Sequence, residues 1–198
     1  MKIVGYTFYT QTQVDMFLKP DSALLVNNKP FFLPDFAKRF EMHPCLVGRI
    51  SRMGRNIEER FADRYYDATA IGLNIQAEGD MEASRFEQHI CNVAFDNSFV
   101  VGTFAEQEKS KFLLRVDESR EDSLELTYMT LEHAIAQISK YITLRTGDMI
   151  AVPYVNAEPK ARKISAFVQL DTGRYLERGM LIEVEDAAGR ERLRCRIK

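Results

Sequence analysis

The stretch MLIEVEDAAGRERLRCRI, residues 180–197, indicates most directly how this chain folds. It predicts two β-strands separated by a turn at residues 186–189. In the second strand Leu193, Cys195 and Ile197 alternate with arginines, so one face is apolar and the other faces water. We therefore predict a C-terminal β-hairpin and a final third of the chain that is built from strands.

Further strands are predicted upstream of this hairpin. Apolar and β-branched residues favour strands over residues 46–53, 68–77, 111–116 and 149–155. Short extended pieces over residues 17–34 favour a second hairpin, with its turn at Asn27-Asn28.

Two helices are predicted among these strands. Apolar residues form one stripe over residues 131–142, and Thr130 precedes them as an expected N-cap. Asn56 is expected to cap a second helix, in which Ile57, Phe61 and Tyr65 recur every four residues. Two helices within many strands predict a mostly-β or α+β fold with a rolled or barrel-like sheet, in a single domain over 1–198.

Composition narrows the functional classes. The net charge of -2 provides no strong field for nucleic acid or an anionic membrane, and no apolar stretch is long enough to span a bilayer. The cysteines, Cys45, Cys91 and Cys195, are too few and too far apart for a disulfide framework. We expect a cytoplasmic protein that binds neither nucleic acid nor membrane.

Five motifs, in this order, resemble the fumarylacetoacetate hydrolase family in its short bacterial form. They cover most of residues 17–151. They are Phe17-Leu18-Lys19-Pro20 with Ser22, the run NNKPFFLPDFAKRF at 27–40, Gly54-Arg55-Asn56-Ile57 with Ala62 and Tyr65-Tyr66, Ala94-Phe95-Asp96 with Gly102, and Ile138-Ser139 with Leu144 and Gly147-Asp148.

The resemblance implies a β-roll scaffold that holds a divalent ion. Family members hydrolyse, isomerise or decarboxylate oxo-acids and diketones, using magnesium, manganese or calcium bound by a Glu-x-Glu pair and an aspartate. A lysine and a histidine assist the chemistry, and members commonly form homodimers.

This sequence departs from the family at those positions. Counting back from the Gly54 motif places the Glu-x-Glu pair at His43 and Cys45. The family's aspartate falls at Asn74, and the lysine that precedes its Phe-Asp segment falls at Val93. Three carboxylates are thereby lost, and hard divalent ions depend on such anionic oxygen ligands. The family's Thr-rich loop falls at 152–157, and the residues before Phe17 lack the family's histidine.

Zinc is the alternative cofactor that these residue types suggest. His43 and Cys45 are two apart on a predicted strand and share a face, and imidazole and thiolate suit zinc better than magnesium. His89 and Cys91 repeat the spacing and would complete a four-ligand set. Pro44 between the first pair favours an edge or bulged strand.

We therefore expect a catalytically degenerate member of this family, without a resident cofactor and with a binding or structural role, at a pocket formed by His43, Cys45, Asn74 and Val93. The alternative is a divergent metal-dependent hydrolase, isomerase or decarboxylase, with zinc at His43 and Cys45. In either case the expected partners are a second copy of the chain and a small oxo-acid.

Overall fold

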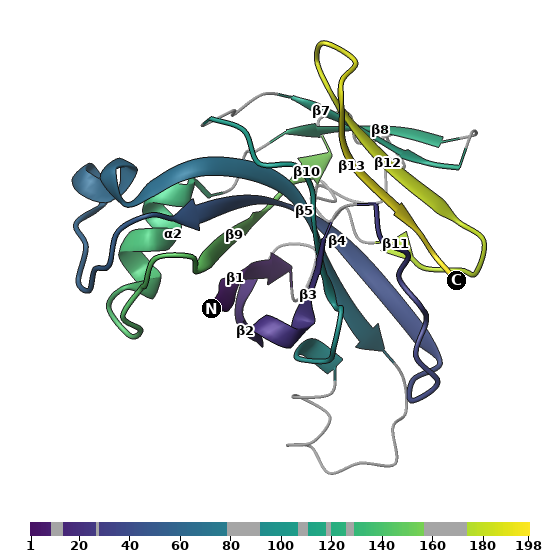
Figure 1. The fold of residues 1–198 in the computed structure, drawn as a ribbon, viewed down its shortest axis with the longest axis horizontal. Coiled ribbons are helices and arrows are strands. Elements are labelled where there is room, and N and C mark those ends of the chain that lie inside the picture. Colours follow the sequence, from purple (N-terminus) through teal and green to yellow (C-terminus); the bar gives the residue numbers. More distant parts are fainter. Residues whose placement is uncertain are drawn as a thin grey trace, which may run out of the picture.

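The fold is described from a computed structural model (Figure 1). The structure describes residues 1–8, 14–26, 28–78, 92–106, 111–117, 120–125, 129–156 and 174–198. It is dominated by two sheets, and the C-terminal hairpin lies in the second of them.

The larger sheet runs across the molecule and curls on itself. Its strands, in spatial order, are β2 (Val14–Pro20), β1 (Lys2–Phe8), β9 (Met149–Pro153), β4 (Arg39–Ile50), β5 (Tyr66–Glu78), β6 (Phe99–Val101) and β3 (Leu24–Val26), with the short β11 (Arg174–Tyr175) also paired to β4. The edge strands β2 and β3 are joined by a 3-10 turn of only three residues, Asp21–Ala23. Because so short a connection cannot span an open sheet, the two edges are drawn together and the sheet becomes a roll (Figure 1).

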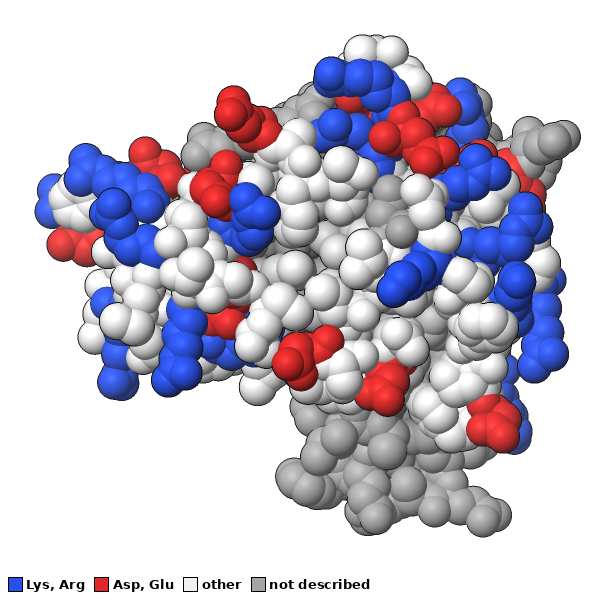
Figure 2. All heavy atoms as spheres, viewed as in Figure 1, with Lys and Arg blue, Asp and Glu red and all other residues white. Residues whose placement is uncertain are grey.

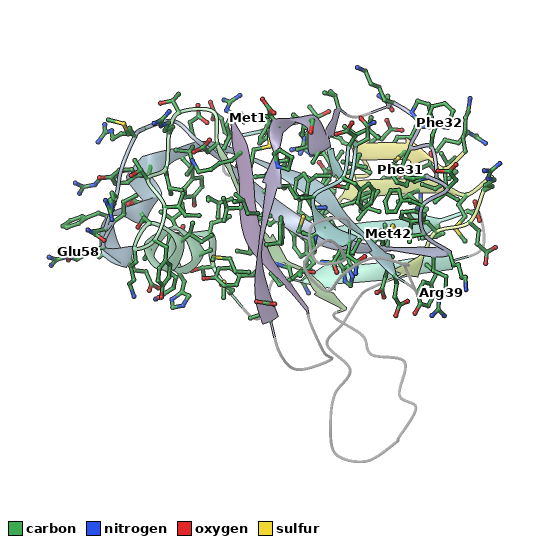
Figure 3. All side chains as sticks on the ribbon, turned by 90° about the horizontal axis from the view of Figure 1, so that it is seen from below. Met1, Phe31, Phe32, Arg39, Met42 and Glu58 are labelled. Atoms are coloured by element: carbon green, nitrogen blue, oxygen red, sulfur yellow. The ribbon has the colours of Figure 1, made fainter. Side chains whose placement is uncertain are left out.

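The second sheet covers the outer face of the roll at one end. It orders β10 (Val155–Asn156), β8 (Arg120–Glu125), β7 (Phe112–Val116), β12 (Leu181–Asp186) and β13 (Glu191–Arg196), all antiparallel. The predicted hairpin is β12–β13, in which Val184 pairs with Leu193. Figure 3 places Phe31 and Met42 on the side of this sheet and Glu58 at the opposite end.

Strand β4 is buried on both faces, so it separates two apolar clusters. Met42 and Leu46 point outward into the main core, which the second sheet and α2 (Leu131–Ile138) also build. Cys45 and Val47 point inward, and pack with Phe17 and other residues inside the roll. Burial on both faces explains why residues 44–48 of β4, PCLVG, carry no polar side chain.

Thr130 caps the N-terminus of α2, as predicted. The Thr130 hydroxyl accepts a hydrogen bond from the His133 amide at 3.1 Å. The helix ends at Ile138 and not at residue 142 as expected. Directly after it, the carbonyl and hydroxyl oxygens of Ser139 accept bonds from the Asn56 and Ile57 amides, so this turn is committed to a tertiary contact.

Two local predictions were wrong. The second predicted helix is present as a 3-10 helix, Glu59–Tyr65, but Asn56 does not cap it, because Asn56 adopts φ 52° and its amide bonds to Ser139. The hairpin expected at 17–34 is absent, since β3 pairs in parallel with β6, and β2 pairs with β1. Asn28 does turn the chain, with φ 67°.

Pro44 was expected at an edge or bulge, but it lies within the central strand β4, opposite Leu73 of β5. On the other side of β4, β9 pairs with Cys45–Arg49 and β11 with Glu41–Met42. Pro44 lies where the registers of these two strands end, and its carbonyl oxygen accepts a hydrogen bond from the Tyr154 amide, just past β9, at 3.0 Å. A proline is tolerated at such a break because it cannot donate to a ladder.

The surface carries mixed charge. Figure 2 shows basic and acidic side chains interspersed over the visible face, with no extended field of one sign. Arg49, for example, forms two hydrogen bonds to Asp67, at 2.9 and 3.0 Å. No helix in the described ranges is both long and apolar enough to cross a membrane.

Candidate functional site

The structure brings three of the four predicted site residues together inside the roll. His43 pairs directly with Asn74 across β4 and β5, and Cys45 pairs with Gly72, so the three side chains share the inner face. Their exposed fractions are 4% for His43, 2% for Cys45 and 1% for Asn74. These three side chains therefore lie on one face and are closed to solvent.

Cys45 is a neutral thiol in this setting. Burial raises its pKa, and this exceeds the opposing effects of the Lys19 ammonium and the Asn74 backbone amide. A thiol held protonated is a poor nucleophile, because nucleophilic attack requires the thiolate.

His43 has an acidic neighbour on its own strand. Its Nε2 lies 3.4 Å from Oε2 of Glu41, two residues earlier on the same inner face. The Glu41 side chain is 27% exposed, so this end of the grouping approaches solvent.

Asn74 presents an amide that the rest of the described structure does not satisfy. Neither its Nδ2 nor its Oδ1 has a hydrogen-bond partner among the described residues, although the side chain is fully buried. Buried polar groups are ordinarily hydrogen-bonded, so an orphaned amide in a protein interior calls for an explanation.

Lys19 is a site residue that sequence reasoning missed. It is 0% exposed, and its ammonium donates to the carbonyl oxygens of Ile75 (2.8 Å) and Ser98 (3.1 Å) and to the Ser98 hydroxyl (2.9 Å). The fourth acceptor is the carbonyl oxygen of Val93. The alternation of β2 was the available signal, since Phe17 and Lys19 point inward while Met16 and Leu18 are exposed.

Burial lowers the pKa of Lys19 well below its ordinary value, and the neighbouring Cys45 opposes that shift. The four surrounding oxygens also favour the protonated form of Lys19 and so oppose the lowering of its pKa. The reason is that an ammonium can donate three hydrogen bonds and a neutral amine only two. All four are uncharged, so the ammonium is solvated by dipoles and has no counter-ion among them.

Val93 lies where the resemblance places a lysine, and its contact with Lys19 gives that position a cation. The Val93 side chain is partly buried against the inner cluster, while its carbonyl oxygen accepts from the Lys19 ammonium. A positive charge thus reaches this place from β2.

The four-ligand zinc set cannot be assembled from what the structure describes. His89 and Cys91 lie outside the described residues. Within those that are described, no three His, Cys, Asp or Glu side chains are grouped to hold a metal. In the region of the family's Thr-rich loop, Val152 and Pro153 end β9 and Tyr154 is buried, while residue 157 is not described.

The fold and the inner grouping define a rolled-sheet protein of the fumarylacetoacetate hydrolase type. The sequence model described as fumarylacetoacetate (FAA) hydrolase C-terminal matches residues 7–197. The chain therefore belongs to the fumarylacetoacetate hydrolase family. No curated protein sequence matches it significantly.

Solved structures share this fold at low sequence identity. A 2-hydroxyhepta-2,4-diene-1,7-dioate isomerase from Mycobacterium marinum is 19% identical with a TM-score of 0.72, covering 99% of this chain and 73% of its own. A fumarylpyruvate hydrolase from Pseudomonas aeruginosa, in complex with Mn²⁺ and pyruvate, is 17% identical with a TM-score of 0.71, covering 99% and 88%. A 5-carboxymethyl-2-hydroxymuconate delta-isomerase from Mycobacterium smegmatis is 16% identical with a TM-score of 0.70, covering 99% and 76%.

The residues at the expected metal positions do not fit magnesium or manganese. These ions prefer carboxylate, carbonyl and water oxygens, whereas positions 43, 45 and 74 offer an imidazole, a protonated thiol and one carboxamide. The nearby Lys19 ammonium would also repel a dication. No chemical step through such a metal follows from this donor set.

Proposed function

We propose that this protein is a member of the fumarylacetoacetate hydrolase family that has lost the family's divalent-metal chemistry and serves as a metal-independent binding protein. One observation carries the proposal. The inner face that the resemblance assigns to three carboxylates bears His43, Cys45 and Asn74, with the Lys19 ammonium close to them.

Charge is the physical basis of the proposal. A carboxylate triad would offer up to three negative charges to a dication, whereas the residues at these positions offer none while Cys45 stays protonated. Electrostatic preference for a cation is thereby replaced by preference for an anion or a neutral molecule. The scaffold itself is retained, with both sheets and with β4 buried on both of its faces.

Manganese titration of the purified protein tests this proposal. Calorimetry and the Mn²⁺ electron paramagnetic resonance signal should show no binding at micromolar concentrations. The triple variant His43→Glu/Cys45→Glu/Asn74→Asp restores three carboxylates to paired strands and should bind Mn²⁺ measurably more tightly than the parent. Micromolar Mn²⁺ binding by the parent, with turnover of an oxo-acid, would overturn the proposal.

The family resemblance also leads us to propose a homodimer, because a binding scaffold can keep its assembly after losing its chemistry. Sedimentation velocity on the untagged protein tests this. A single species at the mass of one chain, 22.8 kDa, across micromolar concentrations would refute it.

A further inference from the structure

Lys19 brings a positive charge into the roll, and among the described residues no negative charge balances it. Its side chain is 0% exposed, and none of the carboxylates in the described parts of the chain forms an ion pair with it. The nearest acid placed on the inner face of β4, Glu41, lies instead beside His43. Buried charges are ordinarily paired, because removing a charge from water is costly.

Asn74 is a second and independent sign of an absent partner. Its amide is 1% exposed, and both polar atoms lack a hydrogen-bond partner among the residues that can be described. An amide always offers a donor at one end and an acceptor at the other. A molecule that satisfies it must therefore both accept and donate.

The two features lie in the same part of the roll. The Lys19 ammonium donates to the carbonyl oxygen of Ile75, the residue next to Asn74 on β5. It also donates to the carbonyl of Ser98, and the next residue, Phe99, pairs with Asn74. Lys19 and Cys45 are near enough to shift each other's pKa, and Cys45 lies two residues from the pairing partner of Asn74.

We infer that this part of the interior is a site for a small carboxylate anion, whose charge balances Lys19 and whose oxygen accepts a hydrogen bond from the Asn74 amide. The inference rests on the proposed metal-independent binding role and names its ligand class. Where family relatives are expected to hold a cation, this chain would hold an anion directly.

The acceptor atom of the Asn74 amide, Oδ1, narrows the class of ligand further. A simple carboxylate or a 2-oxo acid has no proton to give to Oδ1, whereas a 2-hydroxy acid donates its hydroxyl. The ligand must also be small, since a Cβ built at Gly72 would lie only 2.7 Å from Val47 Cγ2 and 3.0 Å from Cys45 Sγ. An acid of two or three carbons with a 2-hydroxyl group meets both requirements.

Glycolate and acetate form a matched pair of probes, because they differ only by the 2-hydroxyl group. Each is titrated into the full-length protein at constant ionic strength, with calorimetry and the side-chain amide resonances of Asn74 as readouts. We expect saturable binding, with glycolate about 3- to 10-fold tighter than acetate, the effect of one hydrogen bond.

Variants assign the binding to these residues. Lys19→Met and Asn74→Ala should each weaken glycolate binding by more than about 10-fold, since one removes the charge and the other the amide. Gln76→Leu is the matched control, because the Gln76 amide lies two residues further along β5 and already bonds to the Thr7 hydroxyl at 3.2 Å. It should leave the glycolate affinity unchanged.

Failure of both acids to saturate, or binding that survives both Lys19→Met and Asn74→Ala, overturns the inference. Equal affinity for glycolate and acetate overturns the assignment to 2-hydroxy acids. If Lys19→Met does not fold, Asn74→Ala and the Asn74 resonances decide the question. Manganese binding refutes the proposed function separately, so the two failures can be told apart.

Discussion

Replacing Asn74 by leucine tests whether the protein tolerates a destabilising amide in its interior. Leucine has the same number and branching of side-chain heavy atoms as asparagine, but no polar atom. The Asn74 side chain is 1% exposed and has no hydrogen-bond partner in the described structure, so its burial is uncompensated. An uncompensated buried amide costs about 1–3 kcal/mol.

Asn74→Leu should therefore raise the free energy of unfolding by about 1–3 kcal/mol, reduced by any crowding from the bulkier methyl groups. Urea unfolding of the ligand-free protein measures this as a higher midpoint at an unchanged m-value. Most substitutions in a protein interior destabilise, so an increase would be distinctive. It would also mean that the amide is retained at the expense of stability, as a binding site predicts.

Ser98→Ala is the control of opposite sign. Ser98 is 0% exposed, and its hydroxyl accepts from the Lys19 ammonium at 2.9 Å. Loss of this hydrogen bond to a charged group should lower the free energy of unfolding by about 1.5–3 kcal/mol. If Asn74→Leu and Asn74→Ala both destabilise by more than about 1 kcal/mol, the Asn74 amide has partners in the folded protein and the reasoning is refuted.

Three further predictions concern the charge of Lys19, the N-cap of α2 and the close contact of Gly102 with β13. Burial lowers the pKa of Lys19, so the folded state holds the lysine proton less tightly than the unfolded state. The free energy of unfolding of the parent, relative to that of Lys19→Met, should therefore rise as the pH increases toward about 10.4. A difference that does not change with pH would contradict this. Thr130→Ala removes the cap of α2 and should lower the free energy of unfolding by about 0.5–2 kcal/mol in urea titrations, while an unchanged value would show that the cap contributes nothing. Gly102→Ala would place a Cβ 2.2 Å from the Arg192 carbonyl oxygen, so it should lower the melting temperature more than Gly189→Ala does. At Gly189 a Cβ has open space, and only the backbone angle, φ +74°, is unfavourable. Equal thermal shifts would show that β13 can move away from the new methyl group.

The fold is shared with solved structures although little of the sequence is. Sequence identity to them is only 15–19%, yet the fold is shared over 99% or more of this chain. The reason lies in β4 and β5, where most inward and outward positions need only be apolar and of suitable size. The few polar positions between them, such as His43 and Asn74, set the charge of the interior without setting the path of the chain.

Local patterns in the sequence determined much of this protein. Alternation of apolar and charged residues placed β12 and β13, and Thr130 marked the start of α2 because a cap acts within one turn. The family resemblance assigned His43 and Asn74 to one site, and the structure shows that they pair across β4 and β5. The lack of carboxylates at these positions is read directly from the sequence.

Strand partners and buried contacts were decided by the tertiary structure. The expected hairpin gave way to a parallel β3–β6 pair, and Pro44 proved to lie in a central strand, because both outcomes depend on strands far away in the chain. Lys19 is the clearest case. The sequence shows a lysine in a motif, but its acceptors on Ile75 and Ser98 lie 56 and 79 residues away. Only the closure of the roll brings them around the ammonium, and that closure gives the interior its positive charge.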